Sequence, residues 1–180
     1  MHRPAVWLPL SLSILLYGCA SRGEPPQTVT TLDLQRYQGQ WYEIARLPLF
    51  FQRKCVASEA RYGVLDESRV SVHNRCRTAG GDWQEAHGEA RLVQGEPAKL
   101  KVRFDNWFSR LFPRLTEGDY WVLYVDGDYQ QALVGHPERK YLWLLSRQPQ
   151  LSDAQREQLL GVAREQGYDN LDELIWREAP

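Results

Sequence analysis

The chain has 180 residues, a length that suits a single domain, and a formal net charge of −1, which gives no electrostatic reason to expect a nucleic-acid partner. Its seven Trp, nine Tyr and five Phe are many for this length, and such side chains build cores and also line apolar ligand cavities. The composition therefore favours a folded domain with a large core, an apolar ligand site, or both.

The N-terminus has the pattern of a secretion signal. Arg3 supplies positive charge, and the apolar run 6–16 is too short to cross a bilayer as a helix. The letters LYGC at 16–19 resemble the bacterial lipobox, in which the cysteine, here Cys19, is acylated and becomes the first residue of the mature protein. Tyr17 departs from that pattern, because a small residue is usual there. An ordinary signal peptide with an incidental cysteine is the alternative.

A short, polar, Pro-rich stretch follows the cysteine and is typical of a flexible tether. We therefore divide the chain into a signal peptide at 1–18, a tether at 19–31 and a folded domain at 32–180. Ala20, not Asp, follows the cysteine, and by resemblance to sorted lipoproteins this favours the periplasmic face of the outer membrane.

From residue 40 onward, short runs of β-branched and aromatic residues alternate with turn signals, a spacing typical of a sandwich or barrel. Eight strands are predicted, at 41–47, 55–64, 69–77, 82–93, 98–105, 118–126, 129–136 and 141–147. Most connections between them are short, and short connections demand antiparallel neighbours. Eight antiparallel strands in chain order predict an all-β, up-and-down barrel, which leaves no exposed sheet edge.

One α-helix is predicted after the strands, at 152–166. Ser152 and Gln155 form a capping box at its start, and Gly167 suits the position after its end. Its apolar side chains share one face, and the last strands are apolar on both of theirs. We therefore expect the helix to cover the outer wall of the barrel, and the run 174–176 to add a short strand.

Two cysteines lie within the predicted barrel. A hairpin centred near Leu65 places Cys55 opposite Cys76, and cross-strand Cβ atoms lie roughly 5 Å apart, which suits a disulfide. Export to an oxidising compartment favours the bond. Free structural thiols are an alternative, and so is a reactive thiol that would make the protein an enzyme. No CxxC or clustered histidine pattern indicates a metal, and we expect no cofactor.

Three blocks of residues resemble the signature of the lipocalin family: Gly39-Gln40-Trp41, Asp119-Tyr120 followed by Tyr124, and Arg147. Gly118 stands where the second block usually has Thr, but the intervals between the blocks match over 33–147. The strings at 41–46 and 141–147 are most similar to bacterial lipocalins of the outer membrane, whose animal relative is apolipoprotein D. The resemblance implies that Arg147 packs across Trp41 at the closed end of the barrel and that these residues identify the fold without touching ligand.

The same resemblance implies a binding protein, not an enzyme, that stores or transports a fatty acid or a lysophospholipid inside the barrel. Its partners would be that lipid and the membrane that holds acylated Cys19. The candidate cavity residues are aromatic: Phe104, Tyr120, Trp121, Tyr124 and Trp143. Strand alternation puts Tyr120 and Tyr124 on one face and Trp121 on the other, without deciding which face is inside.

Two further features remain open. The charged residues of the second and fourth strands face either a ligand headgroup or solvent: Glu59, Arg61, Glu85, His87, Glu89 and Arg91. The stretch 107–113, WFSRLFP, is too apolar for an ordinary loop and could line the mouth, touch a membrane or join two chains into a homodimer. An envelope interaction lipoprotein is therefore a further alternative function.

Overall fold

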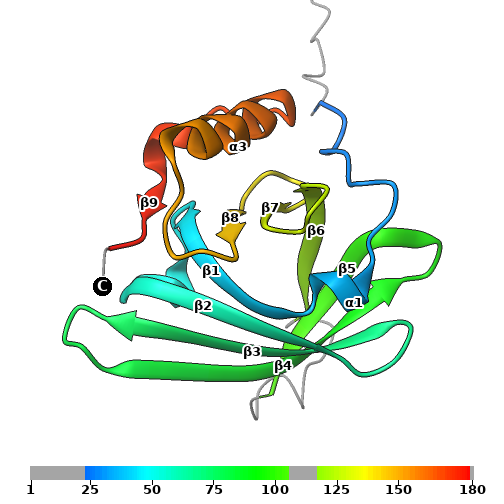
Figure 1. Ribbon diagram of the computed structural model, residues 1–180, viewed down its shortest axis with the longest axis horizontal. Helices are drawn as coiled ribbons and strands as arrows, with labels where there is room; N and C mark the ends of the chain where they lie inside the picture. The colour runs from blue at the N-terminus through cyan, green and yellow to red at the C-terminus, as the bar shows by residue number, and fades with distance from the viewer. Residues whose placement is uncertain (1–22, 106–116, 179–180) are drawn as a thin grey trace, which may run out of the picture.

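The computed structural model describes residues 23–105 and 117–178 (Figure 1). Its strands are β1 (Gly39–Arg46), β2 (Cys55–Val64), β3 (Arg69–Thr78), β4 (Trp83–Val93), β5 (Glu96–Phe104), β6 (Gly118–Val125), β7 (Gln131–Gly135), β8 (Leu142–Ser146) and β9 (Ile175–Trp176). The predicted signal peptide, Cys19 and the stretch 107–113 lie outside the described residues.

The strands close into a barrel. Each of β2 to β7 pairs with the next strand in antiparallel register, and β1 closes the barrel by pairing with both β8 and β2. The predicted eight-stranded, antiparallel, up-and-down barrel is confirmed. The predicted run 174–176 also forms a strand, because β9 pairs with the end of β1 through Ala45 and Arg46. Within the described ranges, no helix has both the length and the apolar character needed to cross a bilayer.

The barrel has a closed end and an open end, which we define by β1. The closed end is where β1 begins and β8 stops, and it is covered by the short helix α1 (Leu34–Tyr37). Asp33 caps α1 through its Oδ1, which accepts hydrogen bonds from the backbone N–H groups of Gln35 and Arg36 at 2.9 and 3.2 Å. The open end carries the connections 47–54, between β1 and β2, and 136–141, between β7 and β8.

The helix α3 (Asp153–Glu165) lies outside the barrel, over β6 to β8 (Figure 1). The expected capping box is present between Ser152 and Gln155, and Gly167 has the left-handed φ of +81° that suits the end of a helix. Leu159 and Ala163 are fully buried against the outward side chains of β7 and β8. The predicted outer cover is therefore confirmed, and the barrel interior forms a separate apolar cluster.

Candidate functional site: the barrel cavity

The barrel encloses a cavity of about 710 Å³. Much of its wall is apolar, and that part includes Tyr62, Val70, Val72, Leu100, Val102 and Leu145. Polar side chains join the wall on the first four strands and the loop after β1: Glu43, Gln52, Asn74 and Gln84. The cavity is within the range of about 300–1,000 Å³ that is typical of small-molecule sites.

Trp41 and Arg147 seal the closed end. The Trp41 side chain is fully buried, and its Nε1 donates a hydrogen bond to the Tyr37 carbonyl at 2.7 Å. The Arg147 guanidinium carbon lies 3.9 Å from the centre of the Trp41 indole ring. Arg147 also donates hydrogen bonds to backbone carbonyls, those of Arg36, Tyr37, Gln38, Gln40 and Tyr129. The stacking implied by the family resemblance is therefore present in the structure.

The other signature residues have separate roles. Gly39 has a φ of +94°, and a Cβ there would approach Arg147 Nη1 to 3.3 Å, so a larger residue would disturb the seal. Asp119 lies away from it and pairs with Lys101 at 2.7 Å. Tyr120 points into the cavity.

Three tyrosine hydroxyls form a chain in the cavity above the seal. Tyr37 and Tyr120 share a hydrogen bond of 2.7 Å, and Tyr120 donates to the Tyr62 hydroxyl at 3.1 Å. Burial raises the pKa of all three, and that of Tyr62 reaches about 12. The hydroxyls therefore stay neutral and are hydrogen-bonded to one another. They leave an uncharged surface for a ligand tail.

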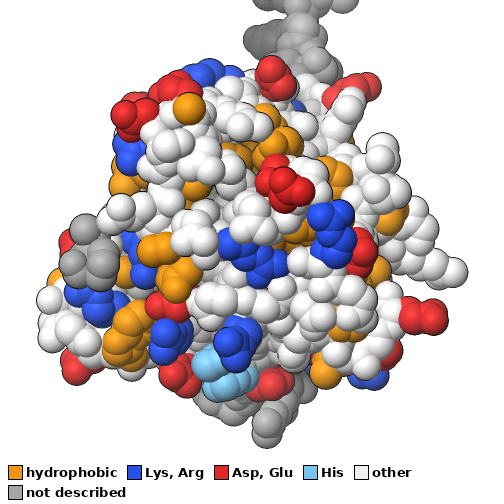
Figure 2. Space-filling model, viewed as in Figure 1, with side chains coloured by type: hydrophobic (Ala, Val, Ile, Leu, Met, Phe, Trp, Pro, Cys, Tyr) orange, Lys and Arg blue, Asp and Glu red, His pale blue; other side chains and the backbone are white. Residues whose placement is uncertain are grey.

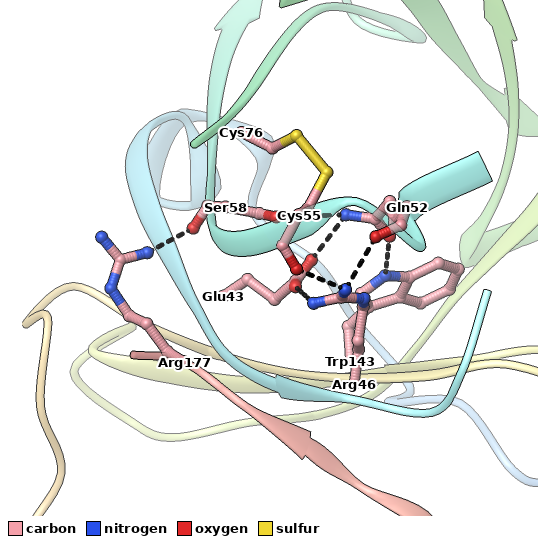
Figure 3. Close-up of a disulfide and its surroundings, with 8 residues drawn as sticks. All are labelled: Glu43, Arg46, Gln52, Cys55, Ser58, Cys76, Trp143 and Arg177. Atoms are coloured by element: carbon pink, nitrogen blue, oxygen red, sulfur yellow. Dashed lines mark hydrogen bonds and ion pairs between the residues drawn. A yellow bond between two sulfur atoms is a disulfide. The ribbon is translucent and has the colours of Figure 1, made fainter. Parts of the chain in front are cut away.

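A buried polar cluster lies at the other end of the cavity (Figure 3) and consists of Glu43, Arg46, Gln52 and Ser58. Arg46 Nη1 donates to Glu43 Oε1 at 2.8 Å, and the two side chains are 3% and 9% exposed. Gln52 Nε2 donates to Glu43 Oε2 at 3.0 Å. Trp143, from β8, reaches the same cluster through its Nε1, 3.3 Å from Gln52 Oε1.

Sequence reasoning missed this cluster because alternation puts positions 43 and 46 on opposite faces of a regular strand. The pairing of β1 with β8 shifts between Glu43 and Ala45, where a bulge turns both Ile44 and Ala45 outward. Glu43 and Arg46 consequently meet on one side of the strand. Two opposite charges three residues apart in an apolar strand are the only signal of the pair in the sequence.

Cys55 and Cys76 form a disulfide, with their Cα atoms 5.5 Å apart (Figure 3). The predicted register is wrong in detail, since Cys55 pairs with Thr78 and Cys76 with Ser58. The hairpin is centred on Glu67, since Val64 pairs with Val70, and this moves the partner of each β2 residue three positions along β3 relative to the prediction. A bulge at Val56 returns the partner of Cys55 by one position. Because both sulfurs are bonded to each other, neither is a thiolate, and the alternative of a cysteine enzyme loses its nucleophile.

The predicted cavity residues divide into two groups. Phe104, Tyr120 and Trp143 line the cavity. Trp121 and Tyr124 do not, and their assignment to the cavity is corrected: both pack under α3, where Gln158 Nε2 donates to the Tyr124 hydroxyl at 2.8 Å. The expectation that Tyr120 and Tyr124 share a face fails because a bulge between Val122 and Tyr124 turns Leu123 and Tyr124 outward together.

The charged residues of β2 and β4 divide between the outer surface and the cavity. Arg75 Nη2 contacts Glu59 at 3.2 Å, and Arg91 contacts Glu89 at 3.3 Å. Figure 2 shows basic, acidic and histidine side chains gathered over β3 and β4. Two of the six residues, Glu59 and Glu85, are also among those that line the cavity, whereas the other four are not.

Three of these outer side chains could hold a metal ion. The ligand atoms of His73, Glu85 and His87 lie within 4.8 Å of one another. The two histidine rings stack with their centres 4.2 Å apart, and His73 Nε2 is 3.2 Å from Glu85 Oε2. Of the three, Glu85 is also among the residues that line the cavity, whereas the two histidines are not.

The geometry agrees with comparisons to known proteins. Residues 32–179 match the family model of the lipocalin-like domain. The chain belongs to the lipocalin family. Outer membrane lipoprotein Blc of Citrobacter freundii is 36% identical, covering 95% of this chain and 94% of its own length. Temperature-induced lipocalin-1 of Arabidopsis thaliana is 40% identical, covering 79% of this chain and 77% of its own length.

More distant similarities extend to an animal protein sequence and to a solved structure with the same fold. Apolipoprotein D of Mus musculus is 27% identical over 80% of this lipocalin and 76% of its own length. The solved structure of insecticyanin from the tobacco hornworm Manduca sexta superposes with a TM-score of 0.64 at 20% identity, covering 87% of this chain and 84% of its own. The resemblance to bacterial lipocalins and, more remotely, to apolipoprotein D is confirmed.

Proposed function

We propose that this lipocalin binds one single-chain amphiphilic lipid in its cavity, stores or transports it without chemical change, and is held at the outer membrane by acyl chains such as palmitate on Cys19. The observation that carries the proposal is the cavity itself. It is sealed at one end by Trp41 and Arg147, apolar over much of its wall and polar toward the open end. A ligand with an acyl tail and a polar headgroup matches this change from an apolar wall to a polar open end.

The energetics allow such a ligand. Burying an acyl chain contributes about 0.8 kcal/mol per CH₂, so a chain of about fourteen methylenes gains roughly 11 kcal/mol before association costs. Those costs remove part of the gain and leave an affinity between about micromolar and nanomolar. The tail would lie along Val72 and Leu100 toward the tyrosine chain.

The polar end of the cavity favours a lysophospholipid over a fatty-acid anion. The described lining carries several carboxylates, and its arginine, Arg75, already contacts Glu59 at 3.2 Å. Behind the wall, Arg46 is bonded to Glu43 and to the carbonyls of Gln52 and Cys55. A second carboxylate there would lose its hydration without gaining a free positive partner. Asn74 Oδ1 is buried and, among the described residues, has no hydrogen-bond donor, so it suits the hydroxyl or amine of a headgroup.

The anchor is supported by the lipobox-like letters at 16–19 and by the relatives that are named outer membrane lipoproteins. Cell fractionation tests it. The Cys19→Ser variant should leave the washed outer-membrane fraction and appear in the periplasm or medium. Retention of the variant in that fraction would contradict the anchor without affecting the binding proposal.

Binding is tested by titrating the Cys19→Ser protein with a lysophospholipid and, separately, with a fatty acid, while following tryptophan fluorescence. We expect saturation at about one ligand per chain, tighter for the lysophospholipid, with unchanged lipid recovered afterwards. Trp143→Phe should remove most of the signal change, because Trp143 lines the cavity, and Trp121→Phe should keep it. No saturable binding below about 100 μM would contradict the proposal. Recovery of a chemically altered lipid would indicate an enzyme.

A further inference from the structure

Two aromatic side chains project from the open end of the barrel. Phe50 and Phe51 are 79% and 68% exposed, and we call this pair the aromatic rim. They form the start of a single 3-10 turn, Phe50–Gln52, in the connection between β1 and β2. Exposed Arg53 and Lys54 follow directly, and the Arg53 guanidinium lies 4.5 Å from the centre of the Phe50 ring. An exposed apolar pair beside two cations is typical of a surface that contacts an anionic interface.

The aromatic rim is held in its exposed position from beneath. Arg46 Nη2 donates to the carbonyls of Gln52 and Cys55, both at 2.9 Å. The disulfide to Cys76 ties the end of the same connection to β3. These contacts keep both ends of the turn in place. Phe50 is presented to the outside, and Phe51 is largely exposed while it also lines the mouth of the cavity.

The N-terminal segment leaves the described fold at this same end. Arg139 Nη2 donates to the Glu24 carbonyl at 2.6 Å, and Gln27 N–H donates to Gln166 Oε1 at 2.7 Å. Arg139 belongs to the connection 136–141, which also carries Tyr141. The Tyr141 ring meets Phe51 edge-on, with the ring centres 6.4 Å apart. One connection therefore contacts both the start of the described chain and the aromatic rim.

The length of chain before Glu24 limits where an anchor can lie. Five peptide units separate Cys19 from Glu24, and a fully extended chain spans at most about 3.6 Å per residue, or roughly 18 Å in all. The strand β4 runs between the two ends of the barrel and has 11 residues. Along the strand that is roughly 36 Å. A membrane anchor at Cys19 therefore favours the open end over the closed end as the side nearest the bilayer.

We propose that the open end of the barrel lies against the membrane, with Phe50 and Phe51 inserted at the lipid interface and Arg53 and Lys54 beside anionic headgroups. The argument from chain length rests on the proposed acylation of Cys19, whereas the aromatic rim and its cations stand independently of it. In this orientation the mouth of the cavity faces the bilayer. A lipid then passes between membrane and cavity without crossing bulk water. Exposing its acyl tail to water would be unfavourable in free energy.

Photocrosslinking in the full chain tests the orientation. The photoreactive residue p-benzoylphenylalanine replaces Phe50 in one variant and Leu65 in another. Phe50 is chosen because it does not line the cavity, so lipid bound inside the barrel is not its target. Leu65 is the matched control, because it is also apolar and exposed, at 52%, but lies in the turn between β2 and β3 at the closed end. After irradiation of intact cells, we expect phospholipid adducts at position 50, at least about tenfold more than at position 65, by mass spectrometry of the purified protein. Equal yields, or adducts at position 65 alone, would overturn the proposal.

A second measurement separates this inference from lipid binding. Purified lipoprotein in vesicles of phosphatidylethanolamine and phosphatidylglycerol should take up pyrene-labelled lysophosphatidylcholine about tenfold more slowly when it carries Phe50→Ser, and at an unchanged rate with Leu65→Ser. Neither residue is among those that line the cavity, so the equilibrium affinity of both variants for the same probe should match the parent. Unchanged uptake by the Phe50→Ser variant would contradict the membrane contact. A parent protein that does not bind the probe would contradict the proposed function. The crosslinking pattern would still decide the orientation in that case.

Discussion

The two ends of the barrel each contain a buried or half-buried arginine, but they use it differently. At the closed end, Arg147 stacks on Trp41 and bonds to backbone carbonyls from two separate segments of the chain, 36–40 and Tyr129. At the open end, Arg46 pairs with the carboxylate of Glu43 beside the cavity. The first arrangement requires the backbone carbonyls to be in place, and it closes one end of the barrel. The second combines the Glu43 carboxylate with the carbonyls of Gln52 and Cys55, and it borders the polar part of the cavity.

The closed end should be the more costly to disturb. Trp41→Ala removes a fully buried indole and the surface on which Arg147 packs, so we expect the free energy of unfolding to fall by about 5 kcal/mol. Urea unfolding measures the change. Trp83→Ala is the control, because that side chain is 45% exposed and should cost about 1 kcal/mol or less. A stable Trp41→Ala protein that has lost only ligand binding would mean that the indole serves the cavity.

At the open end, the cost should depend on whether one or both charges are removed. Arg46→Met leaves Glu43 buried without its cation, and we expect a loss of about 4 kcal/mol. Glu43→Leu should behave similarly. The double variant replaces the pair with apolar side chains and should cost clearly less than the sum, as a double-mutant cycle by urea unfolding would show. Additive losses would indicate that the two side chains act separately.

Reduction of the disulfide at the open end should lower the stability of the whole domain, because it gives the unfolded chain more freedom. The bond between Cys55 and Cys76 spans 21 positions, and closing a loop of that size contributes roughly 3 kcal/mol. We therefore expect a lower melting temperature in the presence of reductant. The Cys55→Ser, Cys76→Ser variant should melt at the same lower temperature with or without it. Equal melting of the parent protein in both conditions would show that the bond contributes little.

High pH should selectively weaken the closed end. The pKa of Tyr62 is about 12 in the folded chain and about 10 when it is exposed, so the folded state holds this proton more tightly. The resulting stability, about 3 kcal/mol for two pKa units, is fully present below pH 10 and is lost as the pH rises toward 12. Urea unfolding at pH 9 and pH 12 measures it. Tyr62→Phe should reduce the loss, and Tyr124→Phe, on the outer wall, should change it less.

Much of the fold could be predicted because it depends on local patterns. Eight strands with short connections specify an antiparallel barrel, and the capping box at Ser152 specifies where α3 begins. The residues Trp41 and Arg147 were identifiable from the spacing of the family blocks. The disulfide was one of three alternatives for Cys55 and Cys76, and the structure contains it, with a register different from the predicted one.

The sequence by itself determined the number and order of the strands and the outer helix, because turn residues, caps and periodicity act between neighbours in the chain. The closed end was expected only from the resemblance to the lipocalin family. Only the tertiary structure decided which side chains face the cavity. Bulges after Glu43 and after Val122 reverse the alternation of β1 and β6, and they arise from pairing with β8 and β7. The polar cluster likewise joins Gln52 to Trp143, 91 positions apart, a meeting that exists only once the barrel has closed.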